Sequence, residues 1–326
     1  MADTGTPRLA SALAAAGIDR DRVAGSRLLT GGTFNAVHLV DLADGASLVV
    51  KLPPGPDTPL LRYERGILAT EALYYRRAAE IADVTVPSVL AVSSDGSAGG
   101  YLVMTRCPGR PWPELSPQPT GGDRAALRAA LGGQLARLHA ITGPGFGYPS
   151  GAVGPLRDGW RAAFLDMVSA VLEDARTFAV TLPRPIGDVE EWFADRAHVL
   201  DAVTRPALVH FDLWDGNILV ASGPSRHRIG ALIDAERAFW GDPLGDFVST
   251  ALFGDIEDDP AFVDGYRAAG GTVTFDDATR LRLLLYRTYL NLIMWVEAVP
   301  RQAGADRVEW LRGKVFEPLA AALGDG

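Results

Sequence analysis

His210-Phe211-Asp212-Leu213-Trp214-Asp215-Gly216-Asn217 is the stretch that decides the fold of this 326-residue chain. Short apolar runs flank it, at residues 207–209 and 218–220, and a third run at residues 229–233 leads directly to Asp234. Such runs predict short buried strands. We therefore expect a loop that begins at His210, carries Asp212 and ends at Asn217.

Asn217 and Asp234 lie close together if the second and third of these strands pair across a turn at residues 222–228. They would offer an amide oxygen and a carboxylate, the hard ligands that Mg²⁺ accepts while it keeps water and phosphate in its other positions. Asp212 would be free to accept or orient the proton of an attacking hydroxyl. The spacing His-x-Asp-x4-Asn, followed by an aspartate at a strand end, is the catalytic-loop pattern of kinases.

The region before this loop supplies the remaining parts of a kinase. Residues 27–52 predict three strands in an antiparallel meander, with Lys51 near the end of the third. Lys51 and Lys314 are the only lysines, and the other 29 of the 31 basic residues are arginine. A lysine in this strand indicates that arginine would not serve there, which suits a phosphate contact.

A helix predicted over residues 60–81 carries two possible ion-pair partners for Lys51. Glu71 is one, and Glu64, seven residues earlier on the same face, is the other. The backbone amides of Gly32 and Thr33, between the first two strands, are expected to cover the nucleotide phosphates.

The organisation of the chain predicts an α+β, bilobal, protein-kinase-like fold. The expected N-terminal lobe, residues 1–105, contains a small antiparallel sheet and one helix. A proline-rich segment at residues 105–122 marks the boundary. The expected C-terminal lobe, residues 106–326, is mainly helical by periodicity, and it would carry the catalytic loop and the acceptor site.

Composition excludes several other classes of protein. The chain has 48% hydrophobic residues and a net charge of -9 without a long basic run, which predicts a globular protein and no nucleic-acid partner. A single cysteine, Cys107, excludes an internal disulfide. Residues 9–17 do not predict a signal peptide, and residues 281–299 contain charged side chains that a membrane span rarely tolerates. We expect a cytoplasmic protein.

The chain resembles the aminoglycoside phosphotransferase and choline kinase superfamily over residues 28–323. At Trp214 and Gly216 it also resembles the fructosamine kinases. The resemblance implies ATP and Mg²⁺ as cofactors, Asp212 as the base, and Thr105 and Cys107 at the adenine. It also implies the roles given above for Lys51 at the phosphates and for Asn217 and Asp234 at the metal. Asp246 matches an aspartate that braces the catalytic loop.

Two features of the loop depart from simple catalytic assignments. His210 is expected to brace the loop by hydrogen bonding and not to take part in chemistry. Phe211 stands where the family most often has glycine, so the loop is expected to be packed differently here.

The acceptor is expected to be a small molecule with a hydroxyl group, cationic, and most simply an aminoglycoside or another amino-bearing sugar. Only 12 positions separate Asp234 from Asp246, too few for the activation segment of a protein kinase. An acidic stretch at residues 239–266 without lysine or arginine could attract the cation. The candidate acceptor residues are Asp215, Glu236, Asp255, Glu257, Tyr289 and Trp295, the last two on a C-terminal helix that also carries Glu297.

Several alternatives remain open at this point. The acceptor could be a fructosamine, choline or another metabolite, and the nucleotide could be GTP. A protein kinase or a non-catalytic nucleotide-binding protein on the same fold is the competing reading. We expect a monomer or a weak homodimer.

Overall fold

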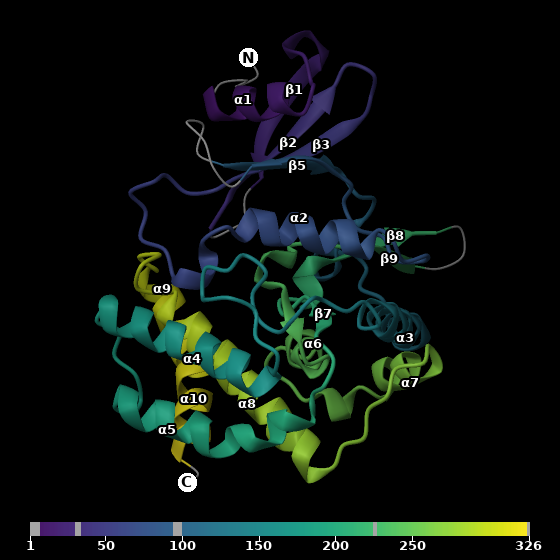
Figure 1. Ribbon diagram of the computed structural model, residues 1–326. Coiled ribbons are helices and arrows are strands. Elements are labelled where there is room, and N and C mark those ends of the chain that lie inside the picture. The colour runs from purple at the N-terminus through teal and green to yellow at the C-terminus, as the bar shows by residue number, and fades with distance from the viewer. Residues whose placement is uncertain (1–6, 30–33, 94–99, 224–226, 325–326) are drawn as a thin grey trace. The chain divides into compact units, whose positions relative to one another are not determined.

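The computed structural model describes residues 7–29, 34–93, 100–223 and 227–324, and the chain forms two compact units (Figure 1). The first unit consists of Met1–Thr58, Gly66–Pro119 and Asp215–Glu236, and the second of Pro59–Arg65, Thr120–Trp214 and Arg237–Gly326. Both units are discontinuous, whereas the sequence suggested a single boundary after residue 105. The difference arises because Pro59–Arg65 belongs to the second unit and Asp215–Glu236 to the first, unlike the residues on either side of each segment.

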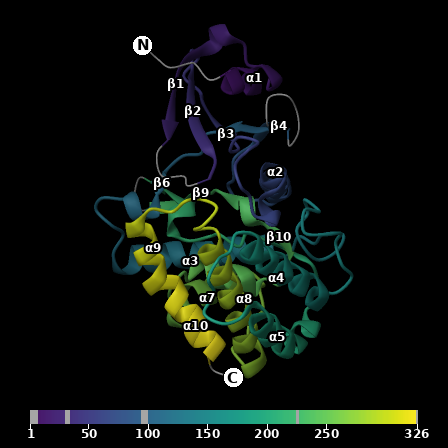
Figure 2. The same ribbon diagram turned by 90° about the vertical axis from the view of Figure 1, so that its left-hand side faces the viewer.

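A five-stranded antiparallel sheet forms most of the first unit, in the order β1-β2-β3-β5-β4. Its strands are β1 (Val23–Leu29), β2 (Ala36–Leu42), β3 (Ser47–Leu52), β4 (Val89–Ser93) and β5 (Tyr101–Thr105). The helix α1 (Pro7–Ala15) lies beside the sheet (Figure 2) and buries Leu9, Ala12 and Leu13 against it. The expected meander of three strands is confirmed.

The alternation of side chains along β3 gives its two faces different tasks. Leu48, Val50 and Leu52 belong to the apolar core beneath α1. Lys51 therefore projects to the opposite face, toward the helix α2 (Ile67–Ala78). This helix begins seven residues later than the sequence suggested, because residues 62–64 form a separate 3-10 turn and Gly66 adopts a left-handed conformation with φ of 75° before the helix starts.

A second, three-stranded sheet of the first unit contains the hairpin expected from the sequence. Strands β8 (Ile218–Ser222) and β9 (His227–Leu232) pair antiparallel, and β6 (Arg110–Pro111) joins the free edge of β8. The Leu232 amide also donates to the carbonyl of Thr85 at 3.0 Å. These bonds explain why residues 215–236 belong to the first unit although they lie far along the chain.

The second unit is mainly helical (Figures 1 and 2). Its helices are α3 (Gly121–Leu138), α4 (Trp160–Thr177), α5 (Ile186–Arg196), α6 (Leu244–Thr250), α7 (Pro260–Ala268), α8 (Asp277–Val296), α9 (Ala305–Leu311) and α10 (Glu317–Gly324). Two short strands, β7 (Ala207–Val209) and β10 (Phe239–Gly241), pair antiparallel. Helices α3 and α7 approach closely at Gly132 and Gly265, where an added Cβ would lie 2.1 Å from a backbone oxygen of the other helix.

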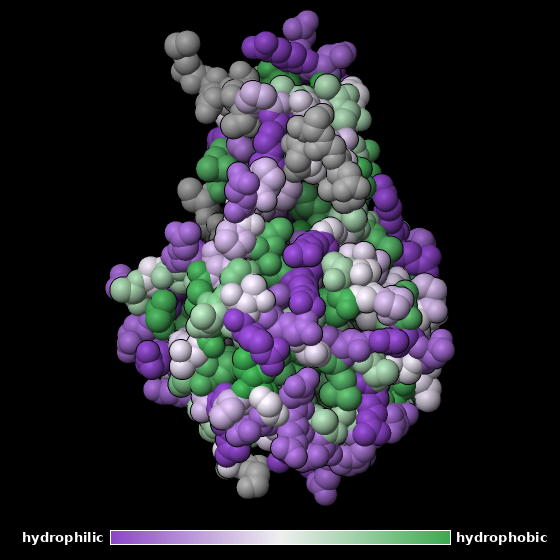
Figure 3. All heavy atoms as spheres, turned by 60° about the vertical axis from the view of Figure 1, so that its left-hand side comes forward, coloured by the Kyte–Doolittle hydropathy of each residue, from purple (hydrophilic) through white to green (hydrophobic). Residues whose placement is uncertain are grey.

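Both hydrophobic and hydrophilic side chains lie on the surface of the chain. On the face in Figure 3, hydrophobic side chains form separate patches divided by hydrophilic ones. Among the described residues, none of the helices is both long enough and apolar enough to cross a membrane. The mixed α+β architecture, with an N-terminal antiparallel sheet and a helical C-terminal part, matches the fold expected from the sequence.

Candidate active site

Lys51 lies at the centre of a carboxylate cluster in the first unit. Its Nζ donates to both oxygens of Glu71, at 2.7 and 2.8 Å, and to Oδ1 of Asp234 at 2.5 Å. Carboxylate oxygens of Glu71, Asp234 and Glu236 all lie within 4.8 Å of one another. One ammonium group therefore faces a cluster of three carboxylates, which leaves net negative charge.

The two carboxylates bonded to Lys51 differ in exposure. The Glu71 side chain is completely buried, whereas the Asp234 side chain is 38% exposed. Burial raises the pKa of Glu71 above its ordinary value, although Lys51 acts in the opposite direction. Burial also acts to lower the pKa of Lys51, but Asp234 and Glu71 outweigh it and hold the pKa well above the usual range. Lys51 therefore stays charged.

Tyr75 ties this cluster to the β8–β9 hairpin. Its hydroxyl donates to Oε1 of Glu71 at 2.6 Å and accepts a hydrogen bond from the Asp234 amide at 2.8 Å. Glu71 and Tyr75 are four residues apart on α2, so they share one face of the helix. The sequence analysis did not single out Tyr75, although this spacing from Glu71 was available in the sequence.

Glu64, the alternative partner for Lys51, has other contacts. It lies in the 3-10 turn of the second unit, where its carboxylate accepts from the Leu61 amide at 2.7 Å and from Arg301 at 2.5 Å. Because the helix breaks before residue 67, Glu64 and Glu71 do not share a helical face. Glu71 is the residue that contacts Lys51.

The hairpin brings Asn217 and Asp234 to the same end of β8 and β9. The Ile233 amide donates to the Asn217 carbonyl at 3.0 Å, one residue before Asp234. Asp234 has a left-handed φ of 66°, which turns the chain directly after the strand. Glu236, a candidate acceptor residue, instead accepts a hydrogen bond from the side-chain amide nitrogen Nδ2 of Asn35 at 2.7 Å and lies with the Lys51 cluster.

The part of the loop that lies in the second unit, residues 210–214, is held by Asp246 from α6. Its carboxylate accepts from the amides of His210 at 3.0 Å and Phe211 at 2.7 Å, and it bonds to the His139 ring at 3.0 Å. The His210 ring is fully buried, and its Nδ1 accepts from the Asp212 amide at 3.3 Å. These contacts agree with bracing by both residues.

Phe211 shows why glycine suits this position. Its φ of 61° is in the left-handed region, where side chains other than glycine are strained. The ring is fully buried and stacks on Tyr289, with ring centroids 5.8 Å apart. The phenylalanine thus fills core space at a position whose backbone favours glycine.

Arg237 holds the side chain of Asp212, a contact that the sequence analysis missed. Its Nη1 donates to Oδ1 of Asp212 at 3.2 Å, and its Nη2 donates to both oxygens of Glu297 at 2.7 and 3.0 Å. Arg237 and Glu297 are both buried. In a chain with 29 arginines, Arg237 carries no local signal beyond its place three residues after Asp234.

Two acceptor candidates in the acidic stretch, Asp255 and Glu257, make hydrogen bonds and ion pairs within the second unit. Asp255 caps a 3-10 turn by accepting from the Glu257 amide at 3.0 Å, and Glu257 binds Arg280 at 2.8 and 2.9 Å. Arginines from other segments also pair with Asp259, through Arg128, and with Asp242, through Arg282. The stretch has no arginine of its own, so these pairings with distant arginines could not be read locally.

The aromatic candidates on α8 also differ from the expectation. Tyr289 is fully buried and bonds to the hydroxyl of Tyr148 at 3.1 Å, so it belongs to the core. Trp295 donates from its indole nitrogen to the Thr181 carbonyl at 2.8 Å. By contrast, Trp214 of the catalytic loop is 41% exposed, and Asp215 is half-buried in the 3-10 turn before β8.

Two of the remaining nucleotide candidates, Thr105 and Cys107, lie at the end of β5 and just after it. The Thr105 side chain accepts from the Ser88 amide at 2.9 Å, and Cys107 is partly buried, which raises its pKa to about 11. A thiol with this pKa stays protonated. Gly32 and Thr33 lie outside the described residues.

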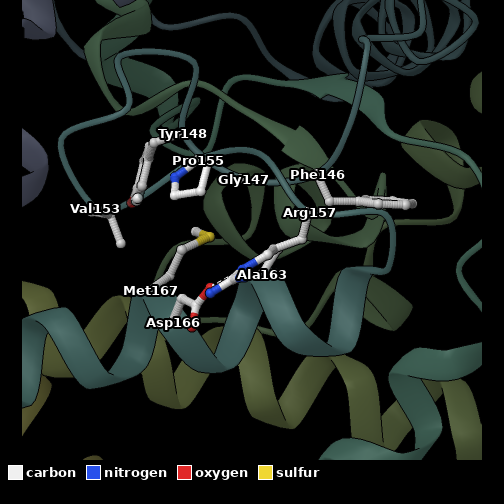
Figure 4. A pocket seen from close by; sticks show the side chains of 10 residues that line it. Phe146, Gly147, Tyr148, Val153, Pro155, Arg157, Ala163, Asp166 and Met167 are labelled. Atoms are coloured by element: carbon white, nitrogen blue, oxygen red, sulfur yellow. Dashed lines mark hydrogen bonds and ion pairs between the residues drawn. The ribbon is translucent and has the colours of Figure 1, made fainter.

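A small pocket in the second unit is not a ligand site for a nucleotide. The loop at residues 146–157 and helix α4 line it, and an ion pair of 2.6 Å between Arg157 and Asp166 lies at its wall (Figure 4). Its empty volume of about 210 Å³ is smaller than the several hundred Å³ of typical ligand sites.

Comparison with known proteins assigns the class. The model of the phosphotransferase enzyme family, APH, matches residues 26–284, and the chain belongs to this family. It is therefore an enzyme, a small-molecule phosphotransferase with a hydroxyl group as acceptor. None of the curated protein sequences matches the chain.

Solved structures share its fold. A Thermobifida fusca protein named as a fructosamine-3-kinase is 23% identical, with a TM-score of 0.70, and the match covers 99% of this chain and 100% of that one. Macrolide 2'-phosphotransferase MphH from Brachybacterium faecium is 21% identical, with a TM-score of 0.58 and coverage of 98% and 99%. A mutant of aminoglycoside phosphotransferase APH(4)-Ia, in complex with ADP and hygromycin B, is 19% identical, with a TM-score of 0.62 and coverage of 96% and 97%.

Proposed function

We propose that this enzyme transfers the γ-phosphoryl group of ATP, with Mg²⁺, to a hydroxyl of a small amino-bearing sugar. The observation that carries the proposal is the Lys51 cluster, in which one ammonium group bonds to the buried Glu71 and to the accessible Asp234. Such a pair of contacts fixes a lysine that can bind nucleotide phosphates.

The donor set fits Mg²⁺. Asp234 and Asn217 offer carboxylate and amide oxygens, and the Asp234 side chain is exposed enough to reach a ligand. Glu236 adds a third oxygen donor near Asp234. When bound, Mg²⁺ neutralises charge on the phosphates and orients the γ-phosphoryl group. Asp234 would then exchange its bond to Lys51 for the metal.

Asp212 is the proposed base. The acceptor oxygen attacks the γ-phosphorus, the bond from that phosphorus to the β,γ-bridging oxygen breaks, ADP leaves, and the acceptor proton passes to the Asp212 carboxylate. Asp246 and Arg237 fix the loop and the side chain for this task. Thr105, Cys107, Gly32 and Thr33 stay as proposed contacts to the adenine and phosphates. The proposed use of ATP supports a cytoplasmic enzyme.

The acceptor class follows from two considerations. The structural neighbours are named for fructosamine, a macrolide and an aminoglycoside, the last in complex with hygromycin B, which supports an acceptor that contains a sugar. Arginines pair with Glu257, Asp259 and Asp242. This pairing favours an acceptor with one or few amines, such as a fructosamine, over a polycationic aminoglycoside. An aminoglycoside remains the second candidate, and it would imply antibiotic resistance.

An ADP-release assay over fructosamines, amino sugars, macrolides, aminoglycosides and choline tests this proposal. We expect Mg²⁺-dependent turnover with a fructosamine or amino sugar and a product that is heavier by one phosphate. Turnover only with polycationic aminoglycosides would replace the preferred acceptor by the second candidate. Phosphorylation of peptides at comparable rates, or no turnover with any sugar, would contradict the proposal.

A further inference from the structure

Glu297, at the C-terminal end of α8, lies at the centre of a buried charge network in the second unit. Its carboxylate accepts from Arg237 at 2.7 and 3.0 Å, from Arg301 at 2.9 Å and from the Tyr63 hydroxyl. The side chain of Arg301 also binds Glu64 at 2.5 Å. Glu297 is 5% exposed, so these contacts are shielded from solvent.

The guanidinium of Arg237 joins this network to Asp212. One of its terminal nitrogens, Nη1, bonds to Asp212, while the other bonds to Glu297. A planar guanidinium with fixed donor directions can hold two carboxylates at a defined separation, each on a different terminal nitrogen. The position of Arg237 therefore depends on Glu297 as well as on Asp212.

The ionisation of the network is consistent with this arrangement. Burial acts to raise the pKa of Glu297, but Arg237 and Arg301 outweigh it, so the pKa lies below its ordinary value and the carboxylate stays charged. Burial raises the pKa of Tyr63 well above its ordinary value, so its hydroxyl stays a donor. Three donors thus fix a single charged carboxylate.

We propose that Glu297 is a positioning residue for phosphoryl transfer, which holds Arg237 so that the Asp212 carboxylate keeps one orientation. Tyr63 and Arg301 fix Glu297 in turn. The inference rests on the proposed role of Asp212 as the base. The proposal concerns the rate of transfer. The contacts of Glu297 with Arg237, Arg301 and Tyr63, and that of Arg237 with Asp212, do not involve the Lys51 cluster, which is proposed to bind the nucleotide.

Glu297→Gln tests the role in turnover, because glutamine keeps the shape and removes the charge. We expect kcat to fall by about 10-fold or more, toward the roughly 100-fold cost of a misplacement near 1 Å, while KM for ATP changes less than about 2-fold. Glu297→Asp keeps the carboxylate and should recover part of kcat.

Asp174→Asn is the matched control. Asp174 on α4 is also 5% exposed, and it accepts from the Arg62 amide at 2.8 Å, beside Tyr63 in sequence. This variant should lose thermal stability and keep kcat. If Glu297→Gln lost only stability and kept kcat as this control does, the proposal would be overturned.

A second measurement does not depend on the acceptor. The free energy of unfolding is compared for Glu297→Gln, Arg237→Met and the double variant. If Glu297 holds Arg237, the double variant costs less than the two single variants together, and additive costs would overturn the proposal. Failure of the proposed function looks different: wild type would show no turnover, and this cycle would still decide whether Glu297 holds Arg237.

Discussion

The Lys51 cluster and the Glu297 network are two charged groupings with opposite designs. In the first, a single ammonium faces the carboxylates of Glu71 and Asp234, with Glu236 nearby. In the second, carboxylates and guanidinium groups alternate from Asp212 through Arg237, Glu297 and Arg301 to Glu64. The first has two more carboxylates than cations and an accessible member. The second has three carboxylates and two guanidinium groups, each carboxylate contacts a guanidinium, and the network is mostly buried.

This difference indicates different tasks. A cluster with unbalanced charge and a side chain that is 38% exposed can exchange a contact for a metal ion or a phosphate. A buried network in which each carboxylate contacts a guanidinium loses much when one partner is removed, because the remaining charge is left without compensation. The first grouping is suited to binding, and the second to holding one geometry.

Asp212→Asn should have the largest effect and should separate the two groupings most clearly. Asparagine keeps the shape but cannot accept the proton, so we expect kcat to fall by about 10²- to 10⁴-fold. Nucleotide affinity, measured by calorimetry, should stay near that of wild type, because the Lys51 cluster is intact. Turnover close to wild type would show that Asp212 is not the base.

Lys51→Met breaks the first grouping and leaves Glu71 buried without its cation. We expect a loss of about 3–5 kcal/mol in the free energy of unfolding, measured with urea, together with loss of nucleotide binding. Lys51→Arg should not restore binding, because the larger planar group does not replace a compact ammonium. Full activity of the arginine variant would argue against a specific role for lysine here.

Phe211→Gly tests how the catalytic loop of the second unit is held. Relief of the left-handed conformation returns about 1–2 kcal/mol, whereas loss of a buried aromatic ring costs about 3–5 kcal/mol. We expect net destabilisation of about 2 kcal/mol in urea unfolding.

Phe253→Gly is the matched control, since Phe253 has a φ of 63° but is 45% exposed. It relieves the same left-handed conformation and loses less buried ring surface, so its stability should stay at or above that of wild type. Equal destabilisation of both variants would mean that burial of the Phe211 ring does not determine the loss of stability in Phe211→Gly.

Acid should affect the two groupings in opposite directions, with the smallest effects of this series. Glu297 has a lowered pKa, so its ionised form contributes stability that is present above the ordinary value of 4.5 and is lost as pH falls through the folded-state pKa. Glu71 has a raised pKa, so its ionised form costs stability, and that cost is relieved as pH falls from the raised pKa toward 4.5.

Thermal unfolding of wild type, Glu297→Gln and Glu71→Gln between pH 3 and 7 measures the pH-dependent contributions of both glutamates to stability. The advantage of wild type over Glu297→Gln should shrink at the acid end of the range. The stability of Glu71→Gln relative to wild type should fall as pH falls toward 4.5. The same direction of change for both variants would contradict the contrast between the groupings.

The loop from His210 to Asn217 and the placement of Asp234 were predictable because they depend on local pattern. Short apolar runs define strands, and the antiparallel pairing of β8 with β9 carries Asn217 and Asp234 to one end of the hairpin. Lys51 was also predictable, since it alternates with the apolar residues of β3 and is one of two lysines in the chain. The roles of these residues stay predictions for the experiments above.

Long-range packing decided the rest. The choice of Glu71 over Glu64 depends on where α2 begins, and the Glu297 network joins residues more than 200 positions apart, such as Tyr63 and Glu297. Strand alternation and turn chemistry act over a few residues, so they are written in the sequence. Which arginine neutralises which carboxylate depends on contacts between distant segments, and in a chain rich in arginine only the folded structure makes that choice.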